Sequence, residues 1–214
     1  MTCWAYKDIE TFKQHSMGVL LFFRENFSYV IPILANRSGI DKDTVRKSVE
    51  IGVALHDIGK TSLHYTSSYY GHEFYSGYLV YRILEDCCNS ELKTLVALAA
   101  MNHHQAMAGR NLKDMIIHGN YTQIPDYEMI DECEKDIKEV LDYIGVNVKY
   151  IPKKVTRSDV VYWFSRLRLV NRMNLYIIIL GPLMVSDTVV ANKNRGGENT
   201  NRIIKEYETW LETY

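Results

Sequence analysis

Apolar residues recur along most of this chain at the three- and four-residue spacing of an amphipathic helix. In 42–57, Val49 and Val53 fall on one face, and 91–104 is rich in leucine and alanine, which favour helices. We therefore predict an all-α fold, with one globular domain over residues 1–214. The predicted helices span 8–26, 42–57, 72–88, 91–104, 126–144, 158–170, 172–192 and 198–212.

Between the predicted helices lie segments rich in Gly, Asn, Ser or Pro, which predict loops. They are 36–39, 61–71, 106–127 and 192–199. The third is long for a compact domain, so we expect it either to gate access to a site or to be disordered. Residues 145–155 alternate β-branched and polar side chains, a pattern that predicts a short extended arm.

The composition changes this picture little, since 47% hydrophobic and 24% charged residues are ordinary for a chain with a real core. The longest apolar stretch, 175–185, is interrupted by Gly181-Pro182 and is shorter than the ~20 residues of a membrane helix. We predict no transmembrane segment and no membrane partner. The N-terminus carries Lys7, Asp8 and Glu10 rather than a signal-peptide pattern, which favours a cytoplasmic protein.

The cysteines, Cys3, Cys87, Cys88 and Cys133, have neither CxxC spacing nor the pattern of a secreted framework. We expect them to be reduced packing residues, and a zinc ribbon is excluded.

Charge is unevenly distributed along the chain. Segment 126–142 is strongly acidic and is best explained as an exposed helix with Ile137 and Val140 on its apolar side. Segment 153–172 is basic and contains Lys153, Lys154, Arg157, Arg166, Arg168 and Arg172. With Tyr162, Trp163 and Phe164 interleaved, it has the charge and stacking faces for nucleic acid. We favour the alternative, a core-facing helix with a solvated basic face.

The strongest chemical signal is His56-Asp57, because an adjacent imidazole and carboxylate suit a hydrolytic metal better than an apolar core. Neighbouring residues on a helix point ~100° apart, so both can reach one centre only where a helix ends. Gly59 follows as a stop signal, and His103-His104 follows a strong helix former in the same way. We expect several helix ends to converge on one pocket.

Further candidate ligands are His15, His72 beside Glu73, and Asp187. The set offers nitrogen and oxygen donors without thiolate, which suits Mn, Fe, Co, Ni or Zn and tolerates Mg. A buried structural histidine is the alternative for each residue alone, whereas the set as a whole favours metal.

The order His15, His56-Asp57-x-Gly59-Lys60, His72-Glu73, His103-His104 and Ser186-Asp187-Thr188 resembles the HD metal-dependent phosphohydrolase superfamily. The resemblance covers most of the chain and implies an HD-domain helical bundle. It is closest to the HD nuclease of type I CRISPR interference systems, in the stand-alone form without a fused helicase. The absence of a G-x-x-x-x-G-K-[ST] motif fits that form.

The resemblance implies two divalent metal ions, such as Mg, Mn, Ni, Co or Fe. The implied first site comprises His15, His56, Asp57 and Asp187, and the second Asp57 as bridge with His72, His103 and His104. Asp57 and Lys60 would be catalytic, with Lys60 neutralising the scissile phosphate, and Ser76 matches a small polar residue of the family.

The implied function is an endonuclease and exonuclease of antiviral defence. It would act on single-stranded DNA exposed in R-loops, with duplex DNA and RNA as further candidate substrates. The implied partners are a separate helicase subunit and a guide-RNA surveillance complex. Two alternatives stay open: a phosphohydrolase of nucleotides or cyclic dinucleotides, and a non-catalytic helical subunit that binds nucleic acid through segment 153–172.

Overall fold

The computed structural model describes residues 2–65, 70–86, 90–104, 124–167 and 173–196, and these are mostly helical, as predicted. The helices are α1 (Phe12–Phe27), α2 (Val30–Ser38), α3 (Lys42–Ala54), α4 (His72–Ile83), α5 (Ser90–Asn102), α7 (Asp131–Ile144), α8 (Arg157–Arg166) and α9 (Met173–Arg195). Short 3-10 helices are η1 (Ile58–Thr61) and η2 (Leu84–Asp86). The strands β1 (Trp4–Tyr6) and β2 (Glu10–Thr11) form one antiparallel pair, and β3 (Tyr127–Glu128) and β4 (Lys154–Val155) form another.

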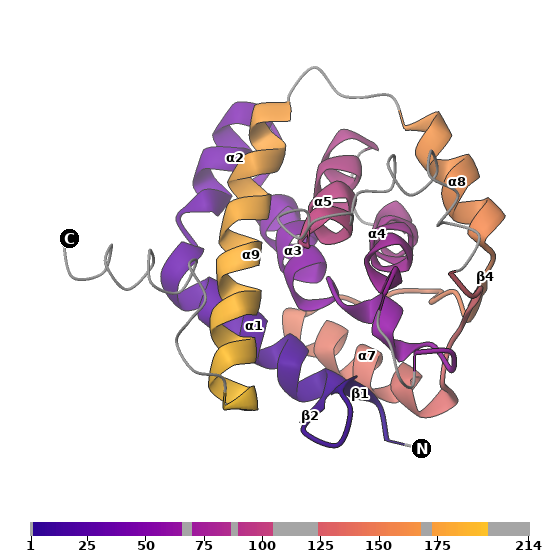
Figure 1. Cartoon of the computed structure of the whole chain (residues 1–214). Coiled ribbons are helices and arrows are strands. Elements are labelled where there is room, and N and C mark those ends of the chain that lie inside the picture. Colours follow the sequence, from indigo (N-terminus) through magenta and orange to yellow (C-terminus); the bar gives the residue numbers. More distant parts are fainter. Residues whose placement is uncertain (1, 66–69, 87–89, 105–123, 168–172, 197–214) are drawn as a thin grey trace.

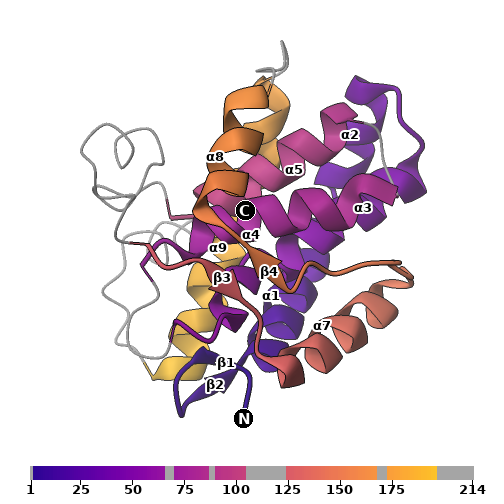
Figure 2. The same cartoon turned by 90° about the vertical axis from the view of Figure 1, so that its right-hand side faces the viewer.

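Helix α5 occupies the middle of the bundle and packs against α3, α4 and α9 (Figure 1). Helix α1 packs against α3, α7 and α9. The β3–β4 ribbon lies between α7 and α8 (Figure 2). This arrangement brings α1 and α9, from opposite ends of the sequence, side by side.

Local capping sets several helix boundaries. Thr11 and Gln14 form a capping box at the start of α1, and Thr156 and Asp159 form one at α8. The prediction of helix from residue 8 is therefore wrong by several residues, because the preceding residues pair as β1 and β2. Likewise the helix predicted from 126 begins at Asp131, since 127–128 pair with 154–155. Strand pairing overrides helical periodicity at both places, within a tight hairpin at the first and between segments far apart in sequence at the second.

Helix α2 was not predicted from the hydrophobic pattern. It is short, and Pro32 falls in its first turn, where a missing backbone N–H costs no helical hydrogen bond. It ends at Gly39, which has φ 74°, a conformation that glycine adopts without strain. The predicted loop 36–39 is therefore wrong except at its last residue.

The predicted loop 192–199 is also wrong for 192–195, because α9 continues to Arg195. Helix α9 likewise continues through Pro182, and Leu175–Arg195 is long and apolar enough to span a membrane by length and composition. In this structure the helix packs against α1 and α5. The core helix of a bundle can have the same length and apolar composition as a membrane-spanning helix.

Several predicted features lie partly or wholly outside the described residues. They are the loop residues 66–69, 106–123 and 197–199, residues 87–88 of the predicted helix 72–88, residues 168–170 of the predicted helix 158–170, residue 172 of the predicted helix 172–192, and the predicted helix 198–212. Cys87, Cys88, Arg168 and Arg172 belong to this group.

The prediction that the cysteines are reduced is wrong for Cys3 and Cys133, which form a disulfide. They are 130 positions apart in sequence, and their Cα atoms lie 5.2 Å apart, within the range that a disulfide requires. Only the packing of the N-terminal residues against α7 brings them together, so sequence spacing gave no signal.

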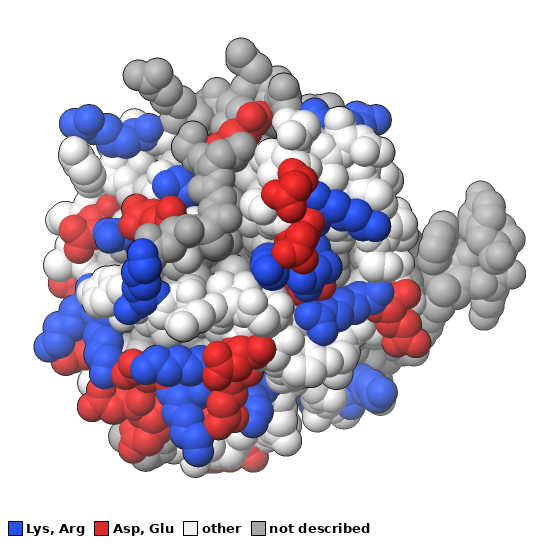
Figure 3. Space-filling model, turned by 180° about the vertical axis from the view of Figure 1, so that it is seen from behind, with Lys and Arg blue, Asp and Glu red and all other residues white. Residues whose placement is uncertain are grey.

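The basic segment is largely paired with the acidic one in the part of the chain that the structure describes. Lys153 contacts Glu134 at 2.7 Å, and Lys154 contacts Glu128 at 2.7 Å. Trp163 is buried against Tyr78, as expected for a core-facing helix. Acidic and basic side chains also lie next to one another on the face opposite Figure 1 (Figure 3). These contacts favour the solvated-face interpretation of this segment.

Candidate metal centre

Most of the candidate ligands come from helix ends, as predicted. Helix α3 ends at Ala54, so His56 and Asp57 lie in the turn that leads into η1. His72 is the first residue of α4, and His103 and His104 follow the end of α5. Two further ligands come from helix faces, His15 on α1 and Asp187 on α9.

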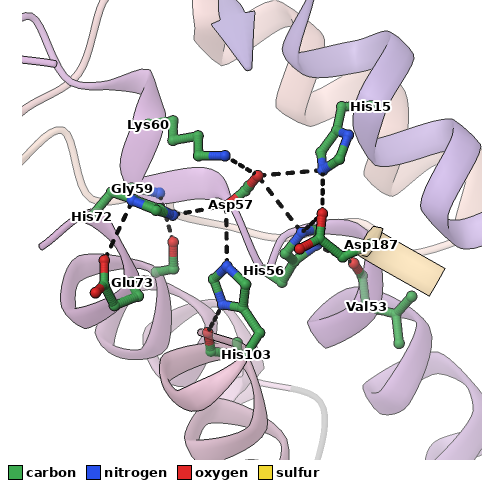
Figure 4. A network of polar contacts seen from close by, with 12 residues as sticks. His15, Val53, His56, Asp57, Gly59, Lys60, His72, Glu73, His103 and Asp187 are labelled. Atoms are coloured by element: carbon green, nitrogen blue, oxygen red, sulfur yellow. Dashed lines mark hydrogen bonds and ion pairs between the residues drawn. The ribbon is translucent and has the colours of Figure 1, made fainter. Parts of the chain in front are cut away.

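The carboxylate of Asp57 is the centre of the site (Figure 4). Its Oδ1 lies 2.9 Å from His72 Nε2 and 3.3 Å from His103 Nε2. Its Oδ2 lies 3.3 Å from His15 Nε2 and 3.6 Å from His56 Nε2. Each oxygen of one buried carboxylate therefore faces a separate pair of imidazoles.

Two groups of side chains are close enough to hold a metal ion, and they contain the same residues as the two sites that the family resemblance implies. The first cluster is His15, His56, Asp57 and Asp187, and the second cluster is Asp57, His72, His103 and His104. Within each, the donor atoms lie within 4.8 Å of one another. Asp187 closes the first cluster, with Oδ1 3.1 Å from His15 Nε2 and 3.5 Å from His56 Nε2.

The other nitrogen of four of these histidines contacts an acceptor. His56 Nδ1 lies 2.8 Å from the carbonyl of Val53, and His103 Nδ1 lies 2.6 Å from the carbonyl of Ala100. The Nδ1 atoms of His15 and His72 instead contact carboxylates, Glu10 at 3.0 Å and Glu73 at 3.3 Å. An Nδ1–H that donates outward leaves the Nε2 lone pair directed at the centre, which is the arrangement of metal-bound histidines.

The Nε2 atoms of His15, His56 and His103 are buried and form no hydrogen bond of good geometry with any residue that the structure describes. Leaving a buried polar nitrogen unsatisfied costs about 1–3 kcal/mol, so such atoms call for an explanation. Three of them converging on two carboxylates fit a metal centre, because a cation satisfies lone pairs that no donor reaches among the described residues.

The electrostatics keep both carboxylates ionised. Burial acts to raise the pKa of Asp57, but the charge of Lys60 and contacts with His103 and His15 outweigh it and hold this pKa well below its usual range. Burial is likewise outweighed at Asp187, whose pKa is lowered chiefly by its contact with His15.

The histidines differ from one another. Burial lowers the pKa of His56, so this imidazole stays neutral, as a ligand must. Burial opposes the charged form of His15 too, but contacts with Asp187, Asp57 and Glu10 outweigh it and raise its pKa to about 10. A cation bound among these carboxylates would compete with that proton.

Gly59 has a different role from the helix stop that the sequence suggested. A Cβ on Gly59 would lie 2.1 Å from the carbonyl oxygen of His72, so only glycine permits this approach of η1 to α4. The Gly59 N–H donates to Ser76 Oγ at 2.9 Å. Lys60 is buried, and its Nζ lies 2.5 Å from Asp57 Oδ2. These contacts fix the segment that carries Asp57.

Sequence reasoning missed Glu10 as part of the site. It lies in the N-terminal hairpin, where it counted only as a charge that argued against a signal peptide. An acidic residue just before a helix cap, five positions from His15, is a weak signal. Its significance comes from the tertiary contact with His15.

Comparison with known proteins adds no family assignment. No protein-family model matches the chain, and no curated protein sequence matches it significantly.

Proposed function

We propose that this protein is a metal-dependent nuclease that hydrolyses phosphodiester bonds of DNA. The observation that supports this most directly is the Asp57 carboxylate, whose two oxygens face separate histidine clusters. A carboxylate shared in this way is suited to bridge two cations, and paired cations are a common arrangement for phosphodiester hydrolysis.

The first ion would be held by the first cluster and the second ion by the second cluster. Imidazoles outnumber carboxylates among the ligands, which favours Mn, Co, Ni or Fe over Mg. When bound, such ions lower the pKa of coordinated water and neutralise charge on the phosphate.

The chain's own residues supply the remaining requirements. Asp57 and Lys60 are the proposed catalytic residues. The ammonium group of Lys60 already lies inside the site, where it adds positive charge that attracts a phosphodiester and stabilises its developing charge. Contacts from Val53, Ala100, Glu10 and Glu73 hold the imidazoles in position, so little rearrangement is needed on binding.

The proposed substrate is single-stranded DNA, with duplex DNA and RNA as further candidates, and the proposed setting is CRISPR interference in the cytoplasm. The support is the resemblance of the motif order to that nuclease family. In the described residues, the basic side chains of segment 153–167 are largely engaged with acidic ones, for example Lys153 with Glu134. This pairing favours dependence on a helicase subunit and a guide-RNA surveillance complex to present unwound DNA.

The test is cleavage of labelled single-stranded and duplex DNA by metal-stripped protein, with Mn, Mg, Ni or EDTA added back. Because each ion contributes several kcal/mol of charge stabilisation, Asp57→Ala should slow metal-dependent cleavage by about 1,000-fold or more. The matched control is Asp142→Ala, which removes an exposed carboxylate far from the site in sequence and should cut normally.

Each of the other outcomes would lead to a different conclusion about the site or the function. Undiminished cleavage by folded Asp57→Ala protein would refute the assigned site. Hydrolysis of nucleotides or cyclic dinucleotides without DNA cleavage would identify a phosphohydrolase. DNA binding without any metal-dependent hydrolysis would identify a non-catalytic subunit.

A further inference from the structure

Glu10 is a buried carboxylate just outside the first cluster, with only 2% of its surface exposed. Its Oε1 lies 3.0 Å from His15 Nδ1 and accepts a hydrogen bond from Asn194 Nδ2 at 2.6 Å. Its Oε2 accepts from Arg195 Nε at 2.9 Å. The carboxylate is thus held by the end of α9 on one side and faces the imidazole on the other.

Residues of helix α9 therefore act on both ring nitrogens of His15, on one directly and on the other through Glu10. Asp187 and Asn194 are seven residues apart, about two helical turns, and so lie on the same face of α9. Asp187 contacts His15 Nε2 directly, at 3.1 Å. Asn194 and Arg195 act on the opposite nitrogen through Glu10.

This network is poorly explained by stability alone. Burying a carboxylate and its cationic partners costs desolvation energy, and apolar replacements of similar volume are often equally stable or more stable. The network becomes useful if the imidazole must point in one direction. A carboxylate that accepts from Nδ1 fixes the ring and increases the basicity of Nε2 as a ligand.

We propose that Glu10 is a positioning residue for the first metal ion, and that Asn194 and Arg195 hold its carboxylate against His15. The inference rests on the proposed metal site and adds to it a dependence of the first ion on both ends of the described chain. The second cluster has a local counterpart, Glu73, which contacts His72 Nδ1 at 3.3 Å from the next position in sequence.

The experiment measures Mn²⁺ affinity at each cluster separately by calorimetric titration. His104→Gln removes a ligand of the second cluster and isolates the first, and Asp187→Asn does the reverse. In the His104→Gln background, Glu10→Gln should weaken binding by about 10–100-fold, the usual effect of losing such a partner. In the Asp187→Asn background, the same change should leave Mn²⁺ affinity as it is.

Glu73→Gln is the matched control and should produce the opposite pattern. Arg195→Gln, which leaves Glu10 in place without one of its donors, should weaken the first cluster by less than Glu10→Gln does. A spectroscopic measurement distinguishes positioning from general damage. In the Zn²⁺-loaded protein, the His15 Nδ1–H proton should resonate far downfield, and Glu10→Gln should move it upfield.

Unchanged Mn²⁺ affinity of the first cluster in Glu10→Gln protein would overturn the proposal. Equal weakening of both clusters would also overturn it, because it would show that Glu10 supports the fold as a whole and not the first cluster in particular. If the wild-type protein binds no Mn²⁺ at either cluster, the proposed function fails together with this inference. If both clusters bind Mn²⁺ and Glu10→Gln changes neither affinity, the inference fails and the proposed function stands.

Discussion

The two clusters that share Asp57 are chemically alike but are built in different ways. Each contains one histidine backed by the main-chain carbonyl three residues earlier, and one backed by a carboxylate. The second cluster comes from α4 and α5, which pack directly on each other and follow one another in sequence. The first joins α1, α3, α9 and the N-terminal hairpin, with Glu10 and Arg195 separated by 185 positions.

The second cluster therefore depends on local geometry, whereas the first depends on how the N-terminal hairpin and α1 pack against α9. Perturbations of the N-terminal hairpin or of α9 should therefore weaken the first ion selectively. Perturbations of the α4–η1 contact should weaken the second.

The largest effect should come from removing one ion at a time. Asp187→Asn and His104→Gln each delete a ligand that belongs to one cluster only, so each should lower the bound Mn²⁺ from two ions to one. DNA cleavage should fall on the order of 100-fold or more in each, since an ion supplies several kcal/mol of charge stabilisation. Metal analysis and single-turnover cleavage measure the two effects, and a variant that keeps both ions would contradict the cluster assignment.

The next effect concerns the disulfide, which ties the N-terminal residues to α7. Replacing Cys3 and Cys133 together by serine should lower the free energy of unfolding by about 2–5 kcal/mol, because the bond closes a long loop. First-cluster affinity should fall more than second-cluster affinity, because Glu10 belongs to the tethered hairpin.

Denaturant unfolding and Mn²⁺ titration test this. A reductant should reproduce the change in wild-type protein and have no further effect on the double variant. Equal weakening of both ions would show that the hairpin does not support the first cluster selectively.

A smaller effect is expected at Gly59, on the side of the second cluster. Gly59→Ala places a methyl group against the His72 carbonyl and should cost about 1–3 kcal/mol, as overpacking usually does. The displacement of His72 should weaken the second ion more than the first. Ser76→Ala, which removes the acceptor of the Gly59 N–H, should act in the same direction by about 1 kcal/mol. Thermal unfolding and Mn²⁺ affinity test both variants. A selective loss of the first ion would contradict the conclusion that the α4–η1 contact supports the second cluster.

The smallest effect should come from the basic segment. Lys153→Ala removes exposed contacts to Asp131 and Glu134 and should leave both ions and the unfolding midpoint unchanged. The salt dependence of DNA binding is the decisive measurement. A slope reduced by about one would show that Lys153 contacts a phosphate, against the solvated-face interpretation.

Much of the fold followed from local pattern. The long amphipathic helices were predicted with boundary errors of a few residues, and the placement of His56-Asp57 and His103-His104 at helix ends was correct. Those features depend on residues three to five positions apart, which periodicity reports directly. The disulfide and the pairing of β3 with β4 were missed because they depend on partners far along the chain, although β4 lies within the predicted extended arm. Helix α2 and the β1–β2 hairpin were missed because they are too short for hydrophobic periodicity to report.

By itself, the sequence determined the donor set, a group of histidines and aspartates without thiolate at positions that suit helix ends. The family resemblance implied how these donors divide between two sites. Only the tertiary structure decided which oxygen of Asp57 faces which imidazoles, and that Glu10 contacts His15. The physical reason is that residue type fixes what an atom can bind, whereas direction is fixed by contacts. Those contacts, such as Arg195 with Glu10 and Gly59 with His72, join segments that have no relation along the chain.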